Sequence, residues 1–204
     1  MNSPRFFSNI LFFLLFLLFL LVSTGYVFVK SENALPIYRQ VPKFELTDQS
    51  GKTFSSDQLK GRVWIANFIF TRCQGMCPLM SGKIMNLQKQ LKNPEIQFVS
   101  FSVDPEYDSP KILSEYAKRF HAKENQWVFL TGEKSKIWEL VSDGFMLGVD
   151  EASPEDLAAG AEPVMHSSRF VLVDKEGKIR GFFDSSESVK MNELVESVQK
   201  LSKQ

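Results

Sequence analysis

The chain has 204 residues, enough for one ordinary domain with an additional segment. Its 24 basic and 24 acidic residues balance, and the sequence contains no basic patch, long charge run or internal repeat. This composition argues against a nucleic-acid partner and against a repeat architecture, so we expect no nucleic acid to bind.

An almost unbroken apolar stretch occupies residues 10–29. A helix of about 20 apolar residues spans a bilayer, and Arg5 before the stretch predicts that residues 1–9 stay in the cytoplasm while the rest crosses. A cleaved signal peptide, cut near Gly25, is the alternative. The apolar stretch continues past the small residues, which favours one uncleaved transmembrane helix. In either case the remaining chain lies on the outer face of a membrane, in an oxidising compartment.

The next elements lead up to the two cysteines. Residues 30–43 contain two prolines and little periodicity, which is typical of a linker. Residues 44–46 and 53–54 flank a turn signal and predict a hairpin. A buried strand over 62–70 follows, and then a helix from Pro78 to about Lys92, with the proline at its first position.

The rest of the chain alternates strands and helices. A capped helix is predicted after Asp108 and Ser109, with Pro110 at its start. Gly144 predicts the end of a later helix, and residues 150–163 are typical of a surface loop. The remaining expected elements are strands over 96–103, 127–130, 164–173 and 178–183, and helices over 133–141 and after 185–186. This order predicts an α/β fold, a thioredoxin-like sandwich with an N-terminal hairpin extension, over residues 44–204.

Both cysteines of the chain, Cys73 and Cys77, lie between the strand over 62–70 and the following helix. The carboxyl end of a strand is where α/β folds place their chemistry. A helix N-terminus favours negative charge, so we expect the thiolate form to be accessible. A structural disulfide is the alternative. It would close so short a loop that it would stabilise the fold weakly, so a redox or metal role explains the placement better.

His166 is the third candidate. It enters the expected strand over 164–173, and in a thioredoxin-like topology the loop before that strand lies against the cysteine loop. Two thiolates and one imidazole can then converge on one ion, although a lone histidine at a strand start is often a satisfied structural group. The other histidine, His121, follows a helix in a polar stretch and reads as a surface residue.

Two soft sulfurs and one nitrogen suit Cu(I). Zinc would need a fourth ligand, for which Asp104 or water is the candidate, although Asp104 fits the end of its strand better. Three methionines occur near the site. Met80 has helical core spacing, whereas Met76 and Met165 are weaker candidates for additional soft ligands.

Several motifs together resemble the Sco/SenC family of copper chaperones. They are residues 68–78 (FIFTRCQGMCP), 103–105 (VDP), 130–132 (LTG), 166–168 (HSS) and 174–177 (DKEG). The resemblance runs from about residue 40 to 200. It implies one copper ion per chain, bound by Cys73, Cys77 and His166, and a role in assembling the dinuclear copper centre of cytochrome c oxidase. It also implies an anchor in the inner membrane, with the C-terminal domain in the periplasm or an equivalent space.

Three hypotheses about function are consistent with these residues. The leading hypothesis is a metallochaperone, not an enzyme, that takes copper from a donor and passes it to the copper-bearing oxidase subunit. It needs a thiol reductant, because oxidation of Cys73 and Cys77 would abolish binding. The alternative is a thiol-disulfide reductase that keeps the acceptor's cysteines reduced through a redox-active Cys73–Cys77 disulfide. The third is a peroxide-reducing enzyme using Thr71 and Arg72, in which His166 would be idle.

Overall fold

The structure is a computed structural model that describes residues 12–22 and 34–203. The chain divides into two compact units, Met1–Pro36 and Ile37–Gln204. In the first unit residues 12–22 are helical. No helix within the described ranges has both the length and the apolar character needed to cross a membrane. Residues 1–9 and both ends of the expected 10–29 anchor lie outside the described residues.

The second unit is built on a seven-stranded sheet with the order β2-β1-β5-β4-β3-β8-β9. Its central strands β3, β4 and β5 are parallel, whereas β8 runs antiparallel to β3 and β9 antiparallel to β8. The hairpin β1–β2 joins the other side through an antiparallel β1–β5 pair. The strands are β1 Glu45–Asp48, β2 Thr53–Ser55, β3 Trp64–Ile69, β4 Gln97–Ser102, β5 Trp127–Thr131, β8 Arg169–Val173 and β9 Ile179–Asp184.

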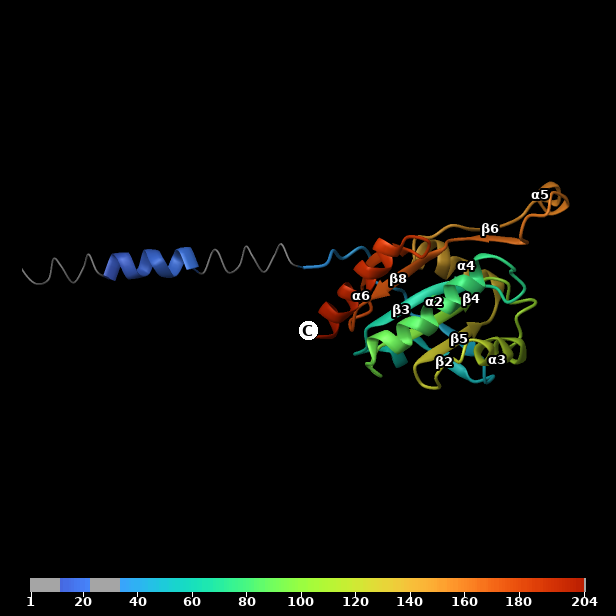
Figure 1. The fold of residues 1–204 in the computed structure, drawn as a ribbon, viewed down its shortest axis with the longest axis horizontal. Coiled ribbons are helices and arrows are strands. Elements are labelled where there is room, and N and C mark those ends of the chain that lie inside the picture. Colours follow the sequence, from blue (N-terminus) through green and yellow to red (C-terminus); the bar gives the residue numbers. More distant parts are fainter. Residues whose placement is uncertain (1–11, 23–33, 204) are drawn as a thin grey trace, which may run out of the picture. The chain divides into compact units, whose positions relative to one another are not determined.

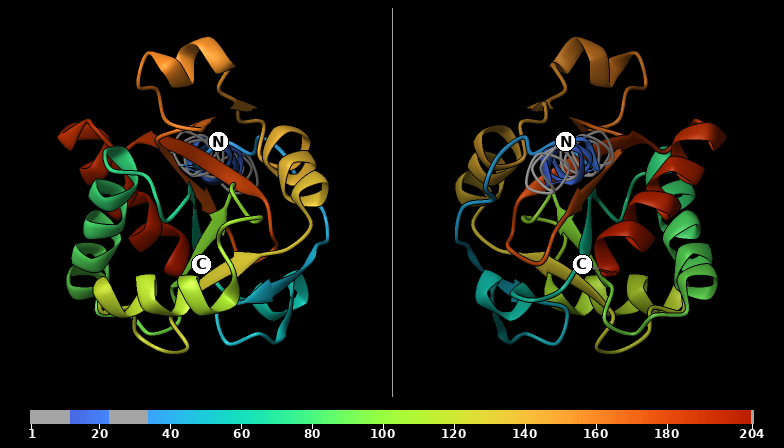
Figure 2. Two further views of the ribbon diagram at one scale, coloured as in Figure 1. Left: turned by 90° about the vertical axis from the view of Figure 1, so that its right-hand side faces the viewer. Right: turned by 90° about the vertical axis from the view of Figure 1, so that its left-hand side faces the viewer.

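Helices cover both faces of this sheet (Figure 1). Helices α2 (Met76–Leu91), α3 (Pro110–Arg119) and α6 (Ser188–Ser202) share one face, and α4 (Lys134–Glu139) lies on the other (Figure 2). A buried contact of 3.0 Å between the hydroxyls of Ser81 and Tyr116 ties α2 to α3. The 3-10 turn η1 (Ser56–Leu59) follows β2, and the π-helical turn η2 (Leu140–Gly144) extends α4.

The sheet is completely buried where β3 and β4 lie side by side. Every residue of both strands is buried, as expected for parallel strands covered on both faces. Phe68 and Phe101 stack with ring centroids 5.5 Å apart, and Phe145, just after η2, packs its ring edge-on at 5.1 Å from Phe68. Burial of such rings stabilises the sheet strongly, so the two strands are firm supports for the loops at their carboxyl ends.

The segment expected to be one loop over 150–163 is an ordered arm. It consists of β6 (Val149–Glu151), α5 (Pro154–Ala158) and β7 (Val164–His166), and β6 pairs antiparallel with β7 in a separate two-stranded sheet. Ser153 and Asp156 form a reciprocal capping box at the start of α5. In Figure 1 this arm extends away from the sheet and helices. The expected strand over 164–173 is therefore two strands, β7 and β8.

The expected hairpin and the Ser109 cap of α3 are confirmed. The main difference lies at the cysteines. Helix α2 begins at Met76 with Gly75 as its N-cap, so Pro78 is not its first residue and Cys77 lies inside the first turn.

Candidate metal centre

One edge of the sheet gathers all the expected site residues. The parallel register pairs Ile69 with Ser102, so β3 and β4 end together. Strand β8 runs antiparallel to β3 and therefore starts at the same edge. The loop after β3 carries Cys73, and β7, just before β8, ends at His166. The sheet topology thus accounts for the approach of segments that lie far apart in the sequence.

The structure places Cys77 and His166 in direct contact. The Sγ atom of Cys77 lies 3.3 Å from Nε2 of His166. The backbone N–H of Cys77 donates to Sγ of Cys73 over 3.4 Å, so the first turn of α2 directs an amide at that sulfur. Both cysteines are free thiols and both are buried, Cys77 completely and Cys73 to all but 7%.

The imidazole is oriented by its own surroundings. Nδ1 of His166 lies 3.1 Å from the carbonyl oxygen of Ser167, and the ring packs edge-on against Phe70 with centroids 5.6 Å apart. With the proton on Nδ1, that nitrogen donates to the carbonyl and the lone pair of Nε2 faces Cys77. A backbone carbonyl that fixes the tautomer in this way is typical of metal-binding histidines.

Burial controls the protonation of this pair. It raises the pKa of the Cys77 thiol far above its usual value, although the helix N-terminus predicted an accessible thiolate. That expectation is wrong for Cys77, because the cost of burying the charge exceeds the stabilisation that a helix N-terminus provides. Burial also lowers the pKa of His166, which keeps the imidazole neutral. Without a cation the site therefore holds a neutral thiol beside a neutral imidazole.

The three expected ligands do not already form a closed metal cage. In residues 12–22 and 34–203, no group of three or more His, Cys, Asp or Glu side chains is arranged to hold a metal ion. Cys77 and His166 are in direct contact, and Cys73 adjoins them through the Cys77 amide. The donor chemistry nevertheless fits a soft cation, because two sulfurs and a neutral imidazole are ligands that Cu(I) prefers.

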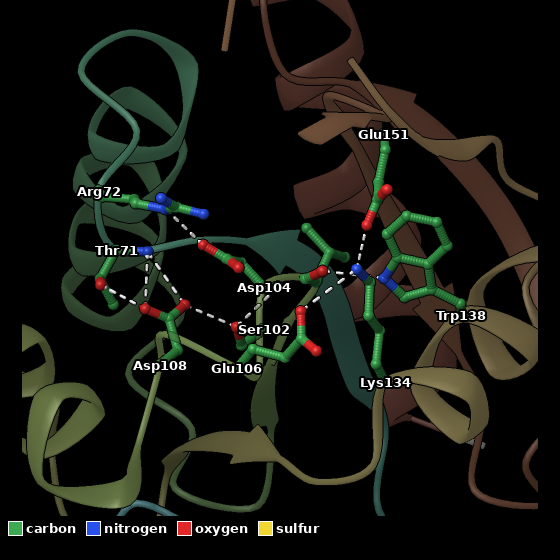
Figure 3. A network of polar contacts seen from close by, with 10 residues as sticks. Thr71, Arg72, Ser102, Asp104, Glu106, Asp108, Lys134, Trp138 and Glu151 are labelled. Carbon is green, nitrogen blue, oxygen red and sulfur yellow. Dashed lines mark hydrogen bonds and ion pairs between the residues drawn. The ribbon is translucent and has the colours of Figure 1, made fainter. Parts of the chain in front are cut away.

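A buried carboxylate supports the start of the cysteine loop (Figure 3). Asp108 accepts hydrogen bonds from the backbone N–H and the hydroxyl of Thr71, and from the hydroxyl of Ser102 at 2.6 Å. Arg72 pairs with Asp104 at 2.6 Å and lies over the ring of Tyr107. Thr71 and Arg72 therefore shape the loop before Cys73.

The same network engages Asp104, the residue that was considered as a fourth zinc ligand. The carboxylate of Asp104 is engaged by Arg72, and its backbone carbonyl accepts from the amides of Tyr107 and Asp108 at 3.1 and 2.9 Å. Asp104 thus lies two residues after β4, which ends at Ser102, and starts the turn that follows.

A second polar cluster fixes the base of the arm. Lys134 of α4 forms ion pairs with Glu106, in the loop after β4, and with Glu151, the last residue of β6. Figure 3 shows the Lys134 ammonium between these carboxylates. The ammonium also lies 4.8 Å from the centre of the Trp138 ring, whose indole donates to the Val103 carbonyl. Sequence reasoning missed this cluster because its members become neighbours only through the tertiary fold.

The methionines and the second histidine lie in different environments. Met80 is fully buried, as its spacing indicated, and His121 is exposed. Met76 is 38% exposed and its sulfur accepts weakly from the Ser185 hydroxyl. Met165 is 51% exposed beside His166. Met76 and Met165 are thus accessible, whereas Met80 contributes to the core.

The fold and the site define an α/β protein of thioredoxin-like architecture that gathers two free thiols and an imidazole at one edge of its sheet. The SCO1/SenC family model matches residues 34–203. The chain belongs to the SCO1/SenC family. The expected family and the expected thioredoxin-like α/β fold are confirmed, whereas the transmembrane helix expected before that fold is not found among the described residues.

Individual relatives agree with this assignment. The SCO1 protein homolog of Bacillus subtilis is 36% identical over 170 residues, which cover 82% of this chain and 85% of that protein. A SCO1/SenC family lipoprotein from Bacillus anthracis has a crystal structure that matches with a TM-score of 0.72 at 32% identity, covering 80% of this chain and 95% of that one. BsSco, a member of the Sco family of cytochrome c oxidase assembly proteins in which a disulfide switch was identified, matches with a TM-score of 0.70 at 35% identity, covering 83% and 96%.

Proposed function

We propose that this protein is a copper metallochaperone whose cargo is held by Cys73, Cys77 and His166. The observation that carries the proposal is the 3.3 Å contact between the Cys77 sulfur and the His166 imidazole, with the Cys73 sulfur at the Cys77 amide. Two thiolates and one imidazole suit Cu(I), which accepts low coordination numbers. Yeast Sco1, 25% identical with a TM-score of 0.62 over 79% of this chain and 90% of its own, has been solved with copper bound.

The low coordination number suits transfer. A three-ligand ion leaves room for an incoming thiol to bind before one of its own ligands departs, so copper passes by ligand exchange. The raised pKa of Cys77 means that copper binding displaces a proton from the buried thiol. The proposed acceptor is the copper-bearing subunit of cytochrome c oxidase, because BsSco is a member of a family of assembly proteins for that oxidase.

The two cysteines also form the proposed redox-active pair. Forming a Cys73–Cys77 disulfide removes two electrons and two protons from the dithiol, and it removes both sulfur ligands. Loading therefore requires a thiol reductant that supplies two electrons. A disulfide switch has been identified in BsSco, which supports the same chemistry here.

We further propose that residues 10–29 are a single-pass anchor, with residues 1–9 cytoplasmic, residues 30–43 as linker and residues 44–204 as the copper-binding domain. Supporting this are the apolar run from 10 to 29 and Arg5 before it. The domain then faces the periplasm or an equivalent space. Protease added to intact spheroplasts tests this orientation, because it should digest the domain and spare the N-terminus.

Copper binding tests the central proposal directly. The reduced full-length protein in detergent, titrated with Cu(I) against a chelator, should bind one copper per chain. Cys77→Ala and His166→Ala should each lose tight binding. His121→Ala is the matched control, because it removes the other, exposed histidine and should bind like the wild type. Tight stoichiometric copper on Cys77→Ala would refute the proposed site.

A thiol-disulfide reductase is the second candidate, favoured by the two free thiols side by side at a helix N-terminus. It needs both cysteines but not the imidazole. His166→Ala therefore separates the two functions, since it should abolish copper binding and leave disulfide exchange intact. If oxidase assembly in cells survives His166→Ala, the reductase becomes the better assignment.

A further inference from the structure

A hydrogen bond joins the two segments that carry the proposed ligands. The backbone N–H of Gln74 donates to Oε1 of Glu162 over 3.0 Å. Gln74 directly follows Cys73 in the cysteine loop. Glu162 lies in the arm, four residues before His166. This contact fastens the cysteine loop to the segment that leads into β7.

The arm has few other means of staying in place. Its strands β6 and β7 form a two-stranded sheet of their own, and an isolated pair of strands is marginally stable. Helix α5 at its tip buries none of its residues. At the base of the arm, Lys134 holds Glu151. On the cysteine side, His166 at the end of the arm contacts Cys77 and Phe70. The contact between Glu162 and Gln74 is a further attachment on that side, where it can set the position of His166 relative to the loop.

The Glu162 carboxylate also acts through its charge. It accepts from the amide directly after Cys73, so a negative charge lies against the loop that carries this proposed ligand. A negative charge beside a metal site favours a bound cation. A carboxylate acceptor also makes a stronger hydrogen bond to a backbone amide than a neutral acceptor does.

We propose that Glu162 is a positioning residue of the metal site, which holds the cysteine loop against the His166 segment and places a negative charge beside the bound cation. The proposal rests on the proposed copper site. Glu162 acts through the Gln74 amide and through its charge.

The contact is tested first without metal, by amide hydrogen exchange of the reduced full-length protein in detergent. The contact is exposed to solvent, so the lower end of the range for a hydrogen bond to a charged group applies, which is about tenfold in local opening. Glu162→Ala should therefore accelerate exchange at Gln74 about tenfold or more. Glu162→Gln keeps a carbonyl acceptor and should restore most of the protection. Glu155→Ala, the same change on the same arm, should stay within about twofold of the wild type.

Copper release is tested next, as the rate at which an excess of chelator removes Cu(I). Glu162→Ala should release copper about tenfold faster than the wild type, the lower end of the same range. Glu162→Gln should fall between them, because it keeps the acceptor and loses the charge. Glu155→Ala should match the wild type.

Three outcomes would count against the proposal. Unchanged Gln74 exchange in Glu162→Ala would show that the contact does not fasten the loop. Faster exchange with unchanged copper release would make Glu162 a structural residue without influence on the metal. Absence of copper binding in the wild type would overturn the proposed function itself, whereas the exchange measurement would still decide whether Glu162 holds the loop.

Discussion

Replacing Asp108 with alanine should destabilise the protein by about 2–4 kcal/mol. Asp108 is completely buried and accepts from three donors, the amide and hydroxyl of Thr71 and the hydroxyl of Ser102. Each donor left unpaired in a buried place costs about 1–3 kcal/mol. Burial also raises the pKa of Asp108, so the cost of burying its charge offsets part of what the hydrogen bonds contribute.

Urea unfolding of the full-length protein in detergent measures this loss as a lower midpoint at an unchanged slope. Asp108→Asn keeps one carbonyl oxygen and removes the buried charge, so it should lose only about 1 kcal/mol. Asp57→Ala is the control, because Asp57 is exposed and forms a surface ion pair with the nearby Lys60.

The pH dependence gives a second check. With its folded-state pKa raised, Asp108 stabilises the fold most below the ordinary value near 3.8, and this contribution is lost as pH rises through the folded pKa. Asp108→Asn should lack that loss. If Asp108→Ala unfolds at the same urea concentration as Asp57→Ala, the buried carboxylate does not hold the cysteine loop, and the reasoning fails.

Three further predictions concern the apo protein. In Cys73→Ser, the rate of alkylation of Cys77 should be low at pH 8 and should rise about tenfold per pH unit above it, because the raised pKa keeps the thiol protonated. A rate that reaches its plateau below pH 8 would contradict this. The lowered pKa of His166 means that its contribution to stability is full above the ordinary value near 6.5 and falls as pH drops below it. In urea titrations, the free energy of unfolding of His166→Asn should therefore fall less steeply than that of the wild type between pH 7 and 5. An identical dependence on pH in the two proteins would refute the assignment. Met80→Ala should cost about 2–5 kcal/mol by thermal or urea unfolding, since Met80 is fully buried, whereas exposed Met76→Ala should change stability little.

Local sequence patterns predicted most of the fold. The apolar run over 62–70 favours a strand and the Ser109–Pro110 cap favours a helix start, and both effects act within a few residues. The structure contains β3 and α3 at those places. The arm was missed because β6 and β7 have three residues each, too few for alternation to show. The signal that was present is Ser153 before Pro154 with Asp156 three residues after the serine, which is a helix start of the same kind as Ser109–Pro110.

The site also has features that the sequence predicted and features that depend on the tertiary fold. Sequence placed Cys73, Cys77 and His166 at one edge of the sheet, because topology alone brings the end of β3 and the start of β8 together. It could not predict that burial would dominate the pKa of Cys77, since burial is a property of the assembled core. Nor could it find Glu162, whose partner Gln74 is 88 residues away.

The ligand set of the bound copper is the most direct test of the account. X-ray absorption at the copper edge, on the reduced full-length protein loaded with one Cu(I), should show two sulfur neighbours and one imidazole nitrogen. The same measurement on His121→Ala, which leaves His166 as the one histidine of the sequence, should match the wild type. A first shell without two sulfurs, or one that loses its imidazole in His121→Ala, would contradict the proposed site.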